Sequence, residues 1–403
     1  MIEPAAQSST TQSSTVQRLL DATRAILPLV RASGDQGERE RRLPRHVADA
    51  LAETGVCRML APRAIGGLEC DPIALLDVVE MLSHAEGSVG WCAQVYTANS
   101  HICGFLAPEV GWEIWGRNPN AIMSGTLAAP YGRATVTDGG YRVTGRWPYG
   151  SGCNNADWLG FTTGVYDGDQ PRLDADGLPE QRIIVVPAAS AIIHDNWRVS
   201  GLKGTGSHDV EVQDVFVPDA WSFWWTETPP HPNPLYKHRW WLLAHGAQRL
   251  GVARAALDAL YELAQEKTPT RQTNLIRDRA ITQMQYAQAE AALGSARAYL
   301  WESTRKLWEK VQTGEPATMK ELAAARLAST NATTASTQVV DLVFSASGGT
   351  AIDESSPIDR LFRDTYAASA HATSSIPTYE QWGKILIHPD PESIPRQPGP
   401  PVL

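Results

Sequence analysis

The sequence predicts an α+β protein that is mostly α, with helical regions on either side of a β unit. Apolar residues recur at helical spacing from about Val16 to Gly116, alternate with polar residues afterwards, and return to helical spacing from about Leu242. At 403 residues the chain is long enough for two or three packed units. The domains that we expect are an N-terminal helical domain at 15–120, a middle antiparallel β domain at 121–220 and a C-terminal helical bundle at 221–388.

Composition and the two chain ends indicate the class of protein. Hydrophobic residues make up 43% and charged residues 20%, and the formal net charge of −9 argues against a nucleic-acid partner. Five cysteines form no CxxC pair, which suits a reducing compartment. The small, polar residues 1–14 predict a disordered tail, and 389–403 form a Pro-rich tail. Because we find neither a secretory leader nor a run of about 18 apolar residues, we expect a cytoplasmic protein without membrane contact.

Two positions in the first helical region mark the ends of helices. The stretch "VADALAETGV" puts Val47 and Leu51 near one helix face and ends at Gly55. The apolar run that begins "PIALLDVVEM" predicts two helices with a break at Gly87-Ser88.

Alternation identifies the β unit. In "ATVTDGGYRVTGRW", apolar and polar residues alternate around Asp138-Gly139-Gly140, which predicts a hairpin. The stretches "RIIVVP" and "DVEVQDVFVP" predict further strands.

A Trp/Pro-rich segment at 221–241 opens the last region. It holds five tryptophans and four prolines, which rules out a regular helix. Its position predicts either a lid over a substrate pocket or a loop that contacts another subunit. The Ala-rich stretches 278–313 and 317–347 then predict long, closely packed helices.

Three common chemistries are not supported by their motifs. His231, His238 and His245 are seven residues apart, too far for ligands on adjacent helical turns, so we expect no metal. "YGSGC" lacks the GxSxG elbow of serine hydrolases. "GLKGTGSHDV" lacks the Walker spacing, although backbone amides in such a turn can bind an anion.

Aromatic residues in loops need another explanation. Tryptophans at helical spacing, such as Trp112 and Trp301, are most simply core residues. In "RWPYGSGCNNADW", however, Trp147 and Tyr149 precede a Gly-Ser-Gly turn, and Trp197 also lies in a loop. These three rings are candidates to wall a planar ligand.

Three stretches carry a resemblance to a known family. They are "GGYRVTGRWPYGSGCNNADW", "NWRVSGLKGTGSHDVEVQDVFVP" and "SPIDRLFRDTYAASAHAT". From about residue 16 to 388 the chain resembles the acyl-CoA dehydrogenase superfamily, and within it the oxygenase components of two-component (group D) flavin-dependent monooxygenases. The resemblance implies an N-terminal helical domain, a middle antiparallel β-barrel domain and a C-terminal four-helix bundle.

The resemblance implies that the planar ligand is a flavin. Tyr149 takes the place of the Trp that packs on the isoalloxazine in dehydrogenases, and Ser151 that of a hydroxyl residue beside the flavin N5. A hydroxyl offers one donor and two acceptor positions, which suits that atom. The residues implied along the rest of the cofactor are Trp197, Gly204, Thr205, Ser207, Gly348 and Gly349.

The base of the common dehydrogenases is missing. Ala372 stands where their "IYEGT" motif has a glutamate, and the neighbouring residue is His371, as in the monooxygenases. The resemblance implies that reduced flavin (FMNH2 or FADH2) and O2 form a flavin hydroperoxide that oxygenates a bulky apolar or aromatic molecule. Ser151 would stabilise the N5 side, and His371, with His101 as a second candidate, would hydrogen-bond the peroxide or deprotonate the substrate. An unperturbed histidine has a pKa of about 6.5 and exchanges protons near neutral pH.

Two alternatives and several partners accompany this interpretation. Some dehydrogenases carry their base on another helix, so an acyl-CoA dehydrogenase or desaturase is one alternative, and a non-catalytic protein of the same fold is the other. No GxGxxG follows a strand, so a separate NAD(P)H:flavin reductase is expected. The resemblance also implies a homotetramer, a dimer of dimers, with a neighbouring chain near Arg271 and Gln283.

Overall fold

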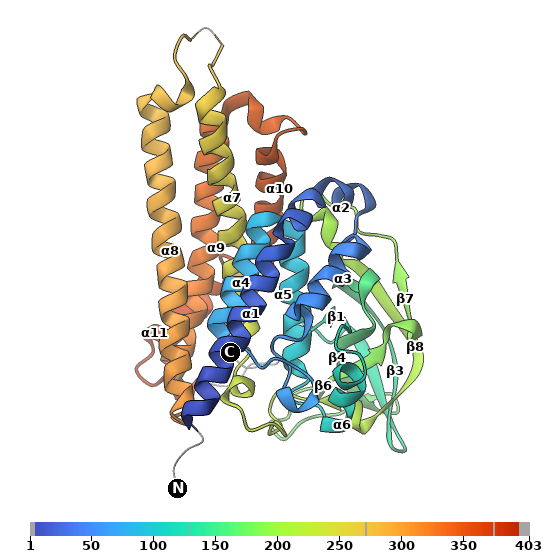
Figure 1. The fold of residues 1–403 in the computed structure, drawn as a ribbon. Coiled ribbons are helices and arrows are strands. Elements are labelled where there is room, and N and C mark those ends of the chain that lie inside the picture. Colours follow the sequence, from blue (N-terminus) through green and yellow to red (C-terminus); the bar gives the residue numbers. More distant parts are fainter. Residues whose placement is uncertain (1–4, 128, 271, 374, 395–403) are drawn as a thin grey trace.

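A curved sheet and a bundle of long helices lie on opposite sides of the N-terminal helices (Figure 1). The computed structural model describes residues 5–127, 129–270, 272–373 and 375–394. The N-terminal helices are α1 (Ala5–Ala32), α2 (Gly34–Glu40), α3 (Arg45–Thr54), α4 (Pro72–Ala85), α5 (Gly87–Ile102) and α6 (Pro108–Gly111). Helix α5 contacts both the bundle and the sheet, so residues on it can reach both.

Two sequence predictions for this region have different outcomes. Helix α4 ends at Ala85 and α5 begins at Gly87, which confirms the predicted break. The prediction of disorder for 1–14 is wrong from residue 5 onward, because α1 already begins at Ala5. These residues extend a helix whose buried Leu19 joins the main core, and tertiary packing of this kind supplies most helical stability in proteins.

The β unit is one nine-stranded sheet with the order β7-β8-β3-β2-β4-β6-β9 and with β1 and β5 also paired to β4. Its strands are β1 (Met123–Thr126), β2 (Gly132–Thr137), β3 (Gly140–Gly150), β4 (Trp158–Asp167), β5 (Gln170–Pro171), β6 (Gln181–Pro187), β7 (Ala191–His194), β8 (His208–Pro218) and β9 (Ser222–Phe223). The predicted hairpin joins β2 to β3, where Gly139 has a φ of +70°. The sheet is mixed rather than wholly antiparallel, because β4 pairs in parallel with both β1 and β2.

The second helical body contains α7 (Ala244–Glu266), α8 (Ala280–Gln312), α9 (Met319–Ser347), α10 (Pro357–Ser369) and α11 (Thr378–Ile387). Helices α8 and α9 match the predicted Ala-rich stretches. Thr318 and Glu321 form a capping box that fixes the start of α9. No α-helix forms in the Trp/Pro-rich segment, which contains the short strand β9 and short 3₁₀ turns instead.

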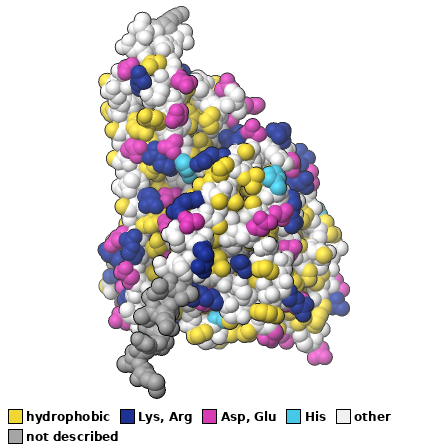
Figure 2. Space-filling view, viewed as in Figure 1, with side chains coloured by type: hydrophobic (Ala, Val, Ile, Leu, Met, Phe, Trp, Pro, Cys, Tyr) yellow, Lys and Arg dark blue, Asp and Glu magenta, His cyan; other side chains and the backbone are white. Residues whose placement is uncertain are grey.

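Charged side chains of both signs are interspersed over the face shown in Figure 2. A cleft of about 480 Å³ between the N-terminal helices and the bundle is lined by ion pairs such as Arg297–Glu80 and includes His84. None of the residues that line it belongs to the candidate site below. Within the described ranges, no helix has the length and apolar content needed to span a membrane.

Trp147 belongs to the core of the sheet. Its side chain is fully buried, stacks on Phe161 with ring centroids 4.4 Å apart, and donates from Nε1 to the carbonyl oxygen of Thr162 at 2.7 Å. A Cβ atom at Gly132 or Gly145 would lie within 2.8 Å of this indole, so two glycines make room for it. No face of Trp147 is free for a ligand, in contrast to the prediction that it walls one.

We therefore expect Trp147→Ala to destabilise the protein by about 3–5 kcal/mol, the usual cost of deleting a buried aromatic ring. Thermal and denaturant unfolding measure this effect. Trp112→Ala is the matched control, because Trp112 is 53% exposed, which corrects its predicted place in the core, and its loss should change stability by less than about 0.5 kcal/mol. Equal melting temperatures for the two variants would contradict the core assignment.

Candidate active site

A distortion at the end of β3 turns Ser151 into the protein. The register of β3 with β8 shifts between Trp147 and Gly150, and Tyr149 has a φ of +64°, in the left-handed region that non-glycine residues rarely adopt. As a result the Tyr149 side chain is 65% exposed whereas Ser151 is buried. Backbone strain of this kind is typical of functional sites.

Ser151 ends a chain of three hydroxyls, which we call the hydroxyl chain (Ser151, Ser207 and Thr205). The Oγ atoms of Ser151 and Ser207 are 2.6 Å apart, and Ser207 Oγ lies 2.7 Å from Thr205 Oγ1. Thr205 Oγ1 also lies 2.8 Å from the carbonyl oxygen of Leu202. A carbonyl cannot donate, so Thr205 donates to Leu202, Ser207 to Thr205, and Ser151 to Ser207.

This order leaves Ser151 with one open position. The Ser151 hydroxyl donates its proton to Ser207 Oγ, and its oxygen accepts a hydrogen bond from Trp91 Nε1 at 3.0 Å. Because a hydroxyl oxygen accepts two hydrogen bonds, the open position is an acceptor. Ser151 can therefore receive an N–H from a ligand, but it cannot donate to one without breaking the chain.

Two imidazoles pack against Trp91. The rings of His371, just beyond α10, and His245, at the start of α7, stack with centroids 4.6 Å apart and an interplanar angle of 24°. The Trp91 ring meets them edge-on at 5.4 Å and 5.8 Å respectively. Gln94 Nε2 donates to His245 Nδ1 at 2.9 Å, and His371 Nδ1 lies 2.8 Å from Thr373 Oγ1.

Both imidazoles are neutral at physiological pH. Burial, together with the nearby charges of Arg249 and Arg326, lowers the pKa of His371 to about 3. Burial also lowers the pKa of His245, helped by His371 and Arg249. The expectation that His371 exchanges protons near neutral pH is therefore corrected: in this environment its ring forms hydrogen bonds as a neutral group.

The structure does not bring His101 to this cluster. His101 lies ten residues after Trp91 on α5, about 15 Å along the helix axis. Its Nε2 donates to the carbonyl oxygen of Leu235 at 3.0 Å, and its ring packs beside Phe105 and Tyr236. Burial lowers its pKa to about 4.

The remaining predicted residues divide into two groups. Near Ser151, the rings of Tyr149 and Trp197 meet edge-on at 6.2 Å, and Gly204 packs so closely that a Cβ would lie 3.1 Å from Ser88. Gly348 and Gly349, by contrast, follow α9, on the far side of the 13-residue α10 from His371 and about 20 Å away along that helix.

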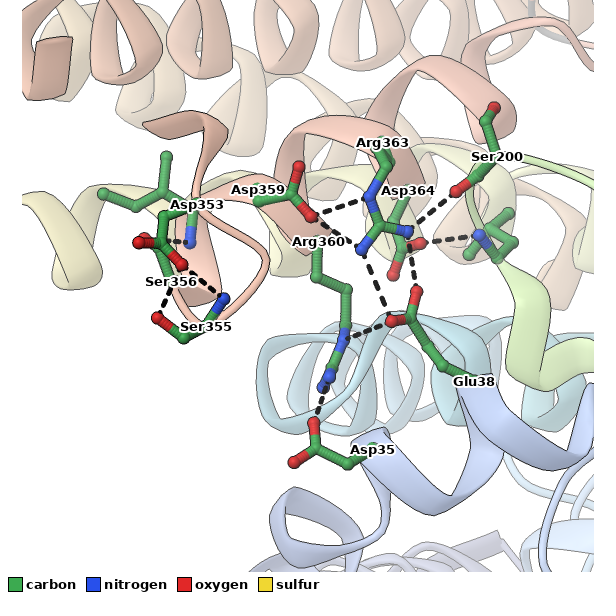
Figure 3. A network of polar contacts seen from close by, with 12 residues as sticks. Asp35, Glu38, Ser200, Asp353, Ser355, Ser356, Asp359, Arg360, Arg363 and Asp364 are labelled. Atoms are coloured by element: carbon green, nitrogen blue, oxygen red, sulfur yellow. Dashed lines mark hydrogen bonds and ion pairs between the residues drawn. The ribbon is translucent and has the colours of Figure 1, made fainter. Parts of the chain in front are cut away.

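Helix α10 holds the turn that carries the hydroxyl chain (Figure 3). Asp364 Oδ1 accepts a hydrogen bond from the Leu202 amide at 2.6 Å, and Arg363 donates to the carbonyl oxygen of Ser200 at 2.7 Å. Arg363 also pairs with Glu38 of α2. The close approach of α5 needs glycine, since a Cβ at Gly87 would lie 2.9 Å from Asp364 Oδ2.

The sequence prediction missed several of these residues. Trp91 was hidden in an apolar helix, and His245 was considered only as a metal ligand. Among the described residues, no group of three metal-ligating side chains comes together. Of the two residues predicted near a neighbouring chain, Gln283 donates to the carbonyl oxygen of Arg277, whereas Arg271 lies outside the described residues.

Comparison with known proteins defines the class of this architecture. The model of the acyl-CoA dehydrogenase N-terminal domain matches residues 15–107, and that of the acyl-CoA dehydrogenase C-terminal domain matches residues 243–375. The first match includes Trp91, and the second includes His245 and His371. The predicted acyl-CoA dehydrogenase fold is thereby confirmed.

Relatives within that class are oxygenases. Indole-3-acetate monooxygenase from Pseudomonas putida is 36% identical over 377 residues, 92% of this chain and 94% of that protein. The HsaA monooxygenase from M. tuberculosis has a TM-score of 0.82 at 29% identity, covering 92% of this chain and 96% of that chain. XiaF from Streptomyces sp., solved with FADH2 and glycerol, has a TM-score of 0.83 at 25% identity, covering 94% and 96%. This chain belongs to the flavin-dependent monooxygenases of the acyl-CoA dehydrogenase superfamily, as an oxygenase component.

The Asp364 carboxylate gives the site a testable dependence on pH. Burial and the Glu86 charge raise its pKa from 3.8 to about 7. A raised pKa of an acid stabilises the folded protein at low pH, and this stabilisation is lost as pH rises through about 7. We expect Asp364→Asn, which keeps an acceptor for Leu202, to gain stability relative to wild type between pH 5 and pH 8.

Melting temperatures at both pH values measure this gain, roughly 2–4 °C for each kcal/mol. Asp138→Asn, at the exposed tip of the β2–β3 hairpin, is the control and should follow wild type at both pH values. If the difference between Asp364→Asn and wild type does not change with pH, the carboxyl of Asp364 does not titrate in this range.

Proposed function

We propose that this chain binds reduced flavin beside Ser151 and uses it with O2 to oxygenate an aromatic small molecule. The observation that carries the proposal is the open acceptor position of Ser151, whose donor Trp91 also packs against two neutral imidazoles. The activity named for the Pseudomonas putida relative, on indole-3-acetate, supports an aromatic substrate.

The residues at the site fit a reduced flavin. The N5 atom of the reduced ring carries a proton, and Ser151 has an open acceptor but no spare donor. The rings of Tyr149 and Trp197 offer apolar surface for a planar ligand, and the turn at 204–207 contacts Ser151 through Ser207. Bound reduced flavin supplies the electrons that activate O2.

His371 is proposed to orient the substrate or the activated oxygen by hydrogen bonding. Its Nδ1 is engaged with Thr373, which leaves Nε2 for a ligand. The low pKa of His371 favours this role over removal of a proton from the substrate. The stacked His245, held by Gln94, fixes the position of the His371 ring.

The proposal also covers the oligomeric state of the protein, the source of its reduced flavin and its location in the cell. We expect a separate NAD(P)H:flavin reductase to deliver FMNH2 or FADH2 in the cytoplasm. A homotetramer, a dimer of dimers, is supported by the distance between Gly348-Gly349 and the His371 cluster, since a second copy could bring another such pair to the flavin. Light scattering that finds a monomer at micromolar concentration would contradict the tetramer.

The function is tested by the product formed per reduced flavin consumed, with any reductase that releases reduced flavin. The isolated chain should not consume NADH, and adding the reductase should start oxygenation of an aromatic substrate. In His371→Ala we expect this ratio to fall by about 10²-fold, because the hydrogen bond that holds the reacting partners is lost, while flavin oxidation continues and releases hydrogen peroxide.

His194→Ala is the matched control. His194 pairs with Glu211 between strands β7 and β8, outside the cluster of Trp91, His245 and His371, and its removal should leave the ratio unchanged. Consumption of NADH by the chain alone would contradict the need for a reductase. An unchanged ratio in a folded His371→Ala protein would give His371 a structural role only.

A further inference from the structure

Arg239, in the Trp/Pro-rich segment, is a buried cation without a polar partner. Its side chain is only 5% exposed, its Nε is unpaired, and its guanidinium makes no hydrogen bond or ion pair with any residue that the structure describes. The buried Arg249 and Arg326, in contrast, each donate to two backbone carbonyls. Burial of an unpaired charge is costly, so an acceptor beside Arg239 would stabilise it.

Two tryptophans near Arg239, Trp225 and Trp241, also lack a hydrogen-bond acceptor in the described part of the chain. The guanidinium lies 5.5 Å from the centre of the Trp225 ring, which in turn lies 6.4 Å from Trp241. The indole N–H groups of both tryptophans are buried and unpaired. All three side chains are hydrogen-bond donors, so what they lack is an acceptor, and an anion with several lone pairs satisfies such a set best.

The surroundings of these donors are aromatic. Phe105 and Phe223 each lie edge-on to Trp225, with ring centroids 5.2 Å and 5.3 Å apart. Burial, together with the positive charge of the neighbouring Arg326, lowers the pKa of Arg239 to about 9. An anion bound beside these two positive charges would reduce their repulsion. A ligand that suits both features has an aromatic ring and a negative charge.

Arg239 is also connected to the proposed catalytic cluster. Arg326, whose charge acts on Arg239, donates from Nη2 to the carbonyl oxygen of Thr373 at 2.8 Å. The hydroxyl of Thr373 contacts His371 Nδ1. Arg326 and Thr373 therefore link Arg239 to the His371 cluster.

We infer that Arg239 is a specificity-determining residue that binds the carboxylate of an aromatic acid substrate. This inference rests on the proposed function, since it assigns the substrate class of the same site. The aromatic rings of the Trp/Pro-rich segment bind the apolar part, and Arg239 selects the acid over neutral molecules of the same shape.

The test compares acids with their amides, which have the same shape but no charge. Indole-3-acetate, phenylacetate and benzoate, each paired with its amide, are titrated into the full-length protein by calorimetry, with reduced flavin under anaerobic conditions and without flavin. For at least one pair we expect the acid to bind about 10–100-fold more tightly, the usual effect of one charge-assisted hydrogen bond.

Variants then identify the residue responsible. Arg239→Gln should reduce the acid-to-amide ratio to about one, and Arg239→Lys should retain part of it. Arg198→Gln, at an arginine with a 72% exposed side chain, is the matched control and should keep the full ratio. Circular dichroism and reduced-flavin binding establish that each variant is folded.

Several results would overturn the inference. One is a ratio near one for all three pairs in the wild-type protein, which needs no variant to fold. Another is an unchanged ratio in Arg239→Gln. Failure of the proposed function is a separate result. If the protein oxygenates amides as well as acids, the proposed function stands and the role of Arg239 is wrong. If it forms no oxygenated product, the proposed function itself is wrong.

Discussion

The peptide unit of Leu202 is the point from which the candidate site is organised. Its amide donates to Asp364, and its carbonyl oxygen accepts from Thr205 Oγ1 and Trp197 Nε1. Leu202 itself has a φ of +53°, a conformation that costs energy and persists only where its surroundings determine it. Because the carbonyl can only accept, it sets the direction of every proton in the hydroxyl chain and so makes Ser151 an acceptor.

Burial then determines the charge states around that chain. The imidazoles of His371 and His245 lose their usual basicity because desolvation penalises the charged form, and two nearby arginines add to the effect. Arg249 and Arg326 keep their charge by donating to backbone carbonyls, whereas Arg239 has no such acceptor among the residues that the structure describes. The site is thus rich in donors and positive charge but holds neutral bases, an environment suited to anionic or oxygen-rich ligands.

Local patterns were sufficient for the elements but not for the site. The β2–β3 hairpin, the break before Gly87 and the long helices α8 and α9 follow from turn chemistry and periodicity, which act within a few residues. The parallel pairing of β4 depends on contacts between distant strands, and no local pattern encodes it. His245 and Trp91 were missed for the same reason, because their partners come from other helices. Trp147 was predicted to wall a ligand because the residues around it are typical of a loop. In the structure, Gly132 and Gly145 leave room for its ring in the core of the sheet.

The Trp/Pro-rich segment shows why composition alone could not assign a role. Its sequence left open a lid or a subunit contact, and both imply exposure. Yet Trp225, Tyr236 and Trp240 are buried, and the Tyr236 hydroxyl donates to the carbonyl oxygen of Leu60. The prolines prevent a helix, so the segment follows an irregular path that carries Arg239 into an apolar environment. A helix there would satisfy its own backbone and turn one face to solvent, whereas this path directs donors inward, away from backbone acceptors.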